Sequence, residues 1–189
     1  MRIDLIYEQV VGKKSYMIRP LDLVEGIMIH RVGKDRATGV DFGDTAEDIC
    51  KAFTEGPAGA YTGNKIPYTF IIQGDARIAQ TLPLSWVGPH ALSLSSKFVS
   101  VALIGDFRAF KDYQGVESAD EPSDDQFCSS VFLLRALLGV LCRPVTAIVG
   151  HTDPDMVKRG STRIQSKRCP GEGLDLYKLR SAVSGGFAL

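Results

Sequence analysis

Short apolar runs that alternate with amphipathic helical segments constrain the fold of this chain more than any other feature. The runs "RIDLIY", "GIMIH", "FVSVALIGDF" and "VTAIVGH" are predicted to be strands because they are short and rich in branched apolar residues. The segment "PYTFIIQGDARIAQTLPL" is typical of two strands around a turn at Gly74-Asp75.

Three segments show helical spacing. In "DTAEDICKAF", Asp44 with Glu47 three residues later predicts a capping box, and Ser123 with Gln126 predicts the start of a longer helix that ends before Pro144. The stretch "LDLYKLRSAV" predicts a last helix. Strands and helices mixed in this order predict one α/β domain over residues 1–189, with a central mixed sheet flanked by helices.

The overall charge argues against two classes of partner. The chain has 22 Lys plus Arg and 22 Asp plus Glu, so its formal net charge is zero, and neither nucleic acid nor an anionic membrane is expected as the main partner. No apolar run is long enough to cross a bilayer. The opening "MRIDLIYEQVVGKKSY" has no apolar signal core, so we expect synthesis in the cytoplasm, where thiols stay reduced.

The four cysteines fall into two groups. Cys50, Cys128 and Cys142 lie in apolar helical contexts and are predicted to be core thiols, because free cysteine packs as a small hydrophobic residue. Cys169, in "SKRCPGEG", has basic and polar neighbours that favour the thiolate form. Pro170-Gly171 would then form the corner that orients Cys169.

Two histidines are predicted to end strands. His30 ends "GIMIH" and His151 ends "VTAIVGH", so both are expected at the rim of one sheet, and the loop with Cys169 can fold back onto that rim. Two imidazoles and a thiolate are a zinc ligand set that leaves a fourth position open. Taken singly, either histidine is more often structural than a metal ligand.

Five motifs, in their order along the chain, carry a family resemblance: "IMIHRV", "IPYTFIIQGDARIAQTLPLSWVGPHA", "VSVALIGDF", "VGHTDPD" and "KRCPG". The chain resembles the zinc-dependent N-acetylmuramoyl-L-alanine amidases of type 2, which share their fold with peptidoglycan recognition proteins. The resemblance runs from about residue 26 to about residue 180. It implies that fold, one Zn²⁺ per chain and peptidoglycan or a muropeptide as substrate.

The resemblance also implies roles for individual residues. His30, His151 and Cys169 match the three zinc ligands, and a cysteine in the third position is typical of phage amidase-type lysozymes and recognition proteins. Tyr68 matches a tyrosine near the water that the metal activates. Lys167 matches a position where lysine accompanies hydrolysis, as a cation for the oxyanion.

Other positions concern the substrate and the departures from the family. His90 and Trp86 match the edge of the substrate groove, although a structural role for His90 stays equally open, and Thr69 replaces the histidine of the family's "YHF" segment. Ala102 stands where many members have a glutamate. Because the loop before Cys169 is long and basic, Lys158 or Arg168 stays an alternative to Lys167.

These implied roles predict an amidase that cuts the bond between the muramoyl lactyl group and L-alanine. Such an enzyme is expected to be a phage or prophage endolysin that reaches the wall through a holin, or a cytosolic enzyme that recycles muropeptides. Two other readings remain: a non-hydrolytic peptidoglycan-binding domain and a purely structural metal. The acidic segment "ESADEPSDD" is interpreted as a solvated loop, so no paired carboxylates suggest glycoside hydrolysis.

Overall fold

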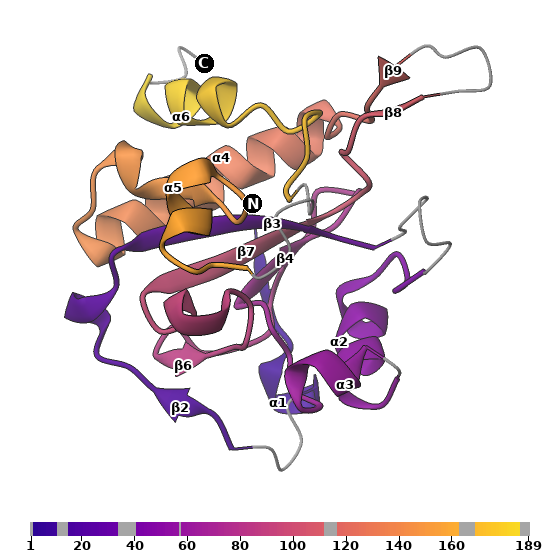
Figure 1. Cartoon of the computed structure of the whole chain (residues 1–189), viewed down its shortest axis with the longest axis vertical. Helices are drawn as coiled ribbons and strands as arrows, with labels where there is room; N and C mark the ends of the chain where they lie inside the picture. Colours follow the sequence, from indigo (N-terminus) through magenta and orange to yellow (C-terminus); the bar gives the residue numbers. More distant parts are fainter. Residues whose placement is uncertain are drawn as a thin grey trace.

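The computed structural model of the chain describes residues 2–10, 15–33, 41–56, 58–111, 117–162 and 169–185. Within them, a six-stranded sheet forms the centre of the molecule (Figure 1). Its order is β1 (Ile3–Leu5), β5 (Ile78–Gln80), β4 (Phe70–Ile72), β7 (Phe98–Ile104), β3 (Gly26–Val32) and β10 (Ile148–Gly150). The β4–β5 pair is antiparallel and the other pairs are parallel, so the predicted mixed sheet is confirmed.

The strands agree with the sequence patterns, with one correction. β4 and β5 form the predicted pair around Gly74-Asp75. Strand β3 does not end at His30 but continues to Val32, paired with β7 along its whole length. His30 therefore lies inside a strand that has neighbours on both sides, where the backbone holds it more firmly than a strand end would.

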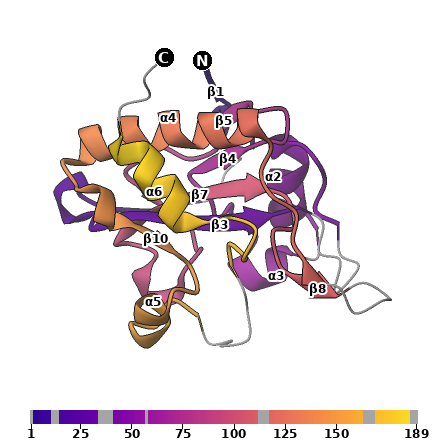
Figure 2. The same ribbon diagram turned by 90° about the horizontal axis from the view of Figure 1, so that it is seen from above.

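Helices cover both faces of the sheet (Figure 2). They are α1 (Tyr7–Val10), α2 (Ala46–Thr54), α3 (Gly59–Thr62), α4 (Asp124–Leu141), α5 (Pro154–Lys158) and α6 (Leu176–Ser184), with short 3₁₀ turns η1 (Leu21–Leu23), η2 (Leu92–Leu94) and η3 (Val145–Ala147). Helices α4 and α6 lie on one face, whereas α3 and α5 lie on the other (Figure 2). Helix α5 occupies part of the loop that was expected to be irregular.

Alternation along β3 decides which side chains meet which helices. Ile27 and Ile29 belong to the core that contains the apolar residues of α4 and α6. Met28 packs instead with Met156 of α5, on the opposite face. Since successive strand residues point to opposite faces, His30 lies on the face of Met28. The sheet thus separates the larger core from the face that carries the histidines.

The helix starts follow the predicted capping chemistry with one shift. Ser123 caps α4 and accepts a hydrogen bond from the backbone N–H of Gln126, as predicted. Helix α2 begins one residue later than expected: Thr45, not Asp44, is the cap, and it accepts from the N–H of Asp48. Threonine and aspartate both cap helices well, so two adjacent candidates differ only through their tertiary surroundings.

The prediction of three core cysteines is confirmed for Cys50 and wrong for the other two. Cys50 is buried under α2, but Cys128 and Cys142 are exposed. On α4 the buried side is filled by leucines such as Leu134 and Leu138, which leaves Cys128 on the other side of the helix. Cys142 is the C-cap residue of α4, with φ of +50°, and lies outside the packed turns.

Two small antiparallel pairs lie beside the main sheet. One joins β2 (Met17–Ile18) to β6 (Trp86–Val87), and the other joins β8 (Phe110–Lys111) to β9 (Glu117–Ser118). Among the described residues, no helix combines the length and apolar character that crossing a membrane requires.

Candidate metal centre

The three predicted metal ligands meet at one point on the sheet. His30 comes from β3 and His151 from the residue after β10, the parallel neighbour of β3. The backbone N–H of His151 donates to the carbonyl of Ile29 over 3.2 Å, so the two histidines start from adjacent backbone positions. Their ring centroids are 4.6 Å apart. One ligand atom from each of His30, His151 and Cys169 lies within 4.8 Å of the other two.

The geometry of these atoms fits a zinc ion. The Sγ atom of Cys169 lies 3.8 Å from Nδ1 of His30. Zinc binds nitrogen at about 2.1 Å and sulfur at about 2.3 Å, so tetrahedral coordination places such a pair about 3.6 Å apart. The donor set of two imidazoles and one thiol also matches the preference of zinc over magnesium or calcium, which take oxygen ligands.

Ser161 fixes the orientation of His151. The Nε2 atom of His151 lies 3.0 Å from the backbone carbonyl oxygen of Ser161, and the hydroxyl of Ser161 donates to the carbonyl of His151 over 2.7 Å. A carbonyl oxygen can only accept, so Nε2 carries the hydrogen and the lone pair of His151 is on Nδ1. Ser161 is fully buried, and no sequence motif had indicated its role.

Thr152 and Gly171 hold the loop that carries Cys169. The backbone N–H of Cys169 donates to Oγ1 of Thr152 over 2.9 Å. At Gly171 the backbone has a φ of +111°, and an added Cβ would lie 2.5 Å from the carbonyl carbon and oxygen of Phe107. Only glycine fits this close approach. The expected corner after Cys169 is therefore present, and Thr152 is a further contact that sequence reasoning missed.

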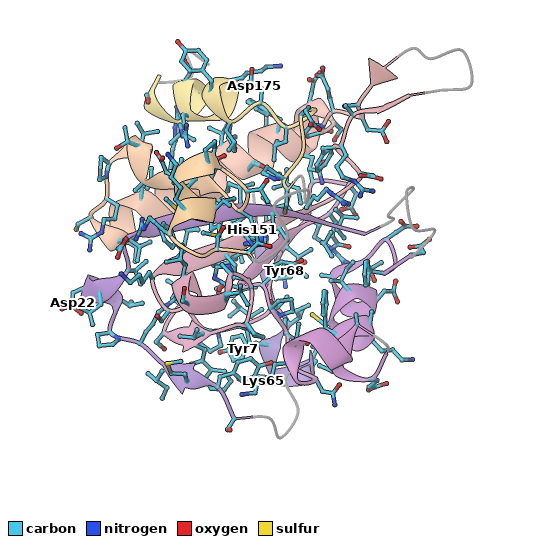
Figure 3. The ribbon with its side chains drawn as sticks, viewed as in Figure 1. Tyr7, Asp22, Lys65, Tyr68, His151 and Asp175 are labelled. Carbon is cyan, nitrogen blue, oxygen red and sulfur yellow. The ribbon has the colours of Figure 1, made fainter. Side chains whose placement is uncertain are left out.

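Tyr68 stands beside the ligand cluster. Its ring centroid is 5.4 Å from that of His30, and Figure 3 shows Tyr68 and His151 together at the centre of the molecule. A T-shaped contact with Phe53 supports the other side of the ring. Burial raises the pKa of the Tyr68 phenol, and the neighbouring Cys169 raises it further, so the hydroxyl keeps its proton and can act as a hydrogen-bond donor.

His90 lies directly against His30. Their rings meet edge to face with centroids 5.0 Å apart, and Nδ1 of His90 is 3.0 Å from Nε2 of His30. The side chain of His90 is only 8% exposed. Burial lowers the pKa of His90 to about 3, so the imidazole is neutral at physiological pH. The position expected at the edge of the substrate groove is thus buried behind a ligand.

The described contacts of Thr69 and Trp86 lie away from the ligand atoms. Thr69 is buried, and its backbone N–H and hydroxyl both contact the hydroxyl of Ser100. Trp86 is half-buried and stacks on Tyr16 with ring centroids 5.3 Å apart. Their expected roles in substrate binding stay predictions.

Three further positions concern charge at the site. Lys167 and Arg168 lie outside the described residues. Lys158 is described, and its largely exposed ammonium pairs with Asp155 over 3.4 Å. Ala102 is paired with His30 across the β3–β7 ladder and is fully buried, so this position offers no carboxylate to the reaction.

Comparisons with known proteins agree with this arrangement. The model of the family described as N-acetylmuramoyl-L-alanine amidase matches residues 20–172. No curated protein matches the chain.

Solved structures share the fold at low identity. The Ph2119 endolysin from a Thermus scotoductus bacteriophage is 20% identical with a TM-score of 0.68, over 96% of this chain and 99% of that one. LysC, an N-acetylmuramoyl-L-alanine amidase from Clostridium intestinale, is 18% identical with a TM-score of 0.65, over 97% and 98%. Drosophila PGRP-LB in complex with tracheal cytotoxin is 18% identical with a TM-score of 0.60, over 95% and 94%.

Proposed function

Because this chain belongs to the N-acetylmuramoyl-L-alanine amidase family, we propose that its peptidoglycan amidase activity depends on one zinc ion held by His30, His151 and Cys169. The observation that carries this proposal is the convergence of two imidazoles and one thiol, from β3, the end of β10 and a separate loop, within 4.8 Å. Ligands that come from three segments are brought together by the fold and not by local sequence.

The substrate bond is the amide between the lactyl group of N-acetylmuramic acid and L-alanine. A zinc ion in such a site polarises a carbonyl and makes water a strong nucleophile near neutral pH. Tyr68, whose phenol keeps its proton, donates a hydrogen bond to the carbonyl oxygen as negative charge develops there. Lys167, two residues before Cys169 in the sequence, supplies a cation for the same oxygen.

The biological setting that fits best is that of a phage or prophage endolysin. The likeness of the fold to the Ph2119 endolysin supports this setting, as does a cysteine in the third ligand position. In that setting the protein is made in the host cytoplasm and a holin gives it access to the wall. The fold is also that of Drosophila PGRP-LB, so the rival function is peptidoglycan binding without hydrolysis.

Digestion of purified sacculi tests the proposal. We expect new α-amino groups on L-alanine and no increase in reducing sugar, and a chelator should abolish the release until zinc is added back. Reducing ends without new amines would make the protein a glycosidase. Tight binding to sacculi without any release of amines, in protein loaded with zinc, would favour the recognition function.

A further inference from the structure

All three histidines of the chain take part in one cluster, although the family resemblance assigns only two of them to the metal. The third, His90, has described contacts at both ring nitrogens. Its Nδ1 lies 3.0 Å from Nε2 of His30, and its Nε2 lies 3.2 Å from the carbonyl oxygen of Phe98. His90 thus connects a backbone carbonyl to a ligand histidine.

The hydrogens in this series can be assigned from one end. The carbonyl of Phe98 can only accept, so Nε2 of His90 carries a hydrogen. A neutral imidazole has one N–H, so Nδ1 of His90 is an acceptor, and Nε2 of His30 must donate to it. The lone pair of His30 is then on Nδ1, the atom that lies 3.8 Å from Sγ of Cys169.

A buried arginine holds the end of the series in place. Arg19 is 4% exposed, and its Nη1 donates to the carbonyl of Phe98 over 2.5 Å and to the carbonyl of Ser95 over 2.9 Å. The guanidinium is always charged, and a nearby positive charge disfavours a second one on His90. The position of the Phe98 carbonyl and the neutral state of His90 therefore have a common cause.

We propose that His90 is a positioning residue that fixes the tautomer and ring orientation of His30, so that His30 presents Nδ1 to the metal. This inference rests on the zinc site proposed above. It replaces substrate contact as the role of His90, because a buried ring with both nitrogens engaged has no polar atom to offer a ligand.

The tautomers can be measured in metal-free protein, without zinc or turnover. A long-range ¹H–¹⁵N NMR spectrum reports which nitrogen of each imidazole carries hydrogen, and each of the three rings is assigned by its loss on substitution. We expect the hydrogen of His30 on Nε2. A hydrogen on Nδ1 of His30 in the wild-type protein would overturn the proposal.

Two nearly isosteric variants then separate the acceptor from the packing. In His90→Asn the amide oxygen can take the place of Nδ1, whereas His90→Leu offers no acceptor to His30. Loss of a residue that orients a metal ligand typically weakens metal binding about 10–100-fold. We expect that loss of zinc affinity in His90→Leu, measured by competition with a chelating indicator, and a much smaller loss in His90→Asn.

Gln126→Leu is the matched control, because it also removes a buried polar side chain, one that donates to the carbonyls of Ile72 and Ile104. It should lower the thermal stability without changing zinc affinity. Wild-type zinc affinity in His90→Leu would overturn the proposal, as would an equal loss in His90→Leu and His90→Asn. A raised KM with normal zinc affinity would return His90 to substrate binding.

These outcomes separate the two proposals. If the wild-type protein binds zinc but His90→Leu binds it equally well, the positioning role fails and the zinc site stands. If the wild-type protein binds no zinc, the proposed function fails, and the NMR spectrum of metal-free protein still decides whether His90 sets the tautomer of His30. Should the variants not fold, the same spectrum of the wild-type protein decides.

Discussion

The described atoms of Thr152 and Cys169 form three hydrogen bonds of 2.9 Å each. The N–H and the hydroxyl of Thr152 both donate to the carbonyl oxygen of Cys169, and the N–H of Cys169 donates back to that hydroxyl oxygen. Thr152 directly follows His151, so these bonds tie the third ligand to the second. The spacing of the ligands therefore depends on a side chain that does not touch the metal.

Replacing Thr152 by valine should weaken zinc binding. Valine keeps the shape but removes the hydroxyl, which leaves the N–H of Cys169 without this acceptor. We expect zinc affinity to fall about 10-fold or more and the free energy of unfolding to fall by about 1–3 kcal/mol. Competition with a chelating indicator and chemical denaturation measure the two effects. Thr152→Ser, which keeps the hydroxyl, is the control, and an affinity equally low in both variants would argue against this role.

Replacing Lys167 by alanine should remove turnover while leaving zinc bound. Loss of one group that stabilises an oxyanion typically lowers kcat about 10²–10³-fold. Lys158→Ala should have a much milder effect, because Lys158 is largely exposed and paired with Asp155. Steady-state kinetics on a soluble muropeptide, together with zinc analysis, compare the two variants. A larger loss in Lys158→Ala would show that the wrong lysine of the loop has been assigned.

Gly171→Ala should both destabilise the protein and disturb the metal site. The added methyl group would have to fit a φ of +111° and would collide with the backbone of Phe107, so we expect a loss of about 1–3 kcal/mol or more and weaker zinc binding. Gly63→Ala is the control: its φ is +63°, and an added Cβ meets nothing within 4 Å. It should cost only about 1 kcal/mol and leave zinc affinity unchanged. Equal effects of the two substitutions on zinc affinity would contradict the role of Gly171.

Local patterns predicted the elements of the fold and the ligand types well. The cap of α4 at Ser123 and the β4–β5 pair depend on residues close together in sequence, so their chemistry is visible there. Cys128 was misplaced because every position of an apolar helix looks alike until the packed face is known. The cap of α2 at Thr45 was missed by one residue for a similar reason, since Asp44 caps equally well on local grounds.

The parts of the site that sequence reasoning missed are those made by tertiary contact. His90 reaches His30 across 60 positions of the chain, and Ser161 contacts His151 through a backbone carbonyl, which every residue has. Arg19 likewise acts on the carbonyls of Ser95 and Phe98. Backbone acceptors leave no signature in a sequence, so only the folded chain shows which ring nitrogen each histidine turns toward the metal.

The zinc content of purified Cys169→Ala protein, compared with that of the wild-type protein, tests the central claim most directly. We expect one zinc ion per wild-type chain and almost none in Cys169→Ala, with folding confirmed for both proteins by circular dichroism. Cys169→Asp should keep part of the zinc, because a carboxylate can replace the thiolate as a ligand. Zinc content in Cys169→Ala equal to that of the wild-type protein would contradict the assignment of His30, His151 and Cys169 as the metal centre.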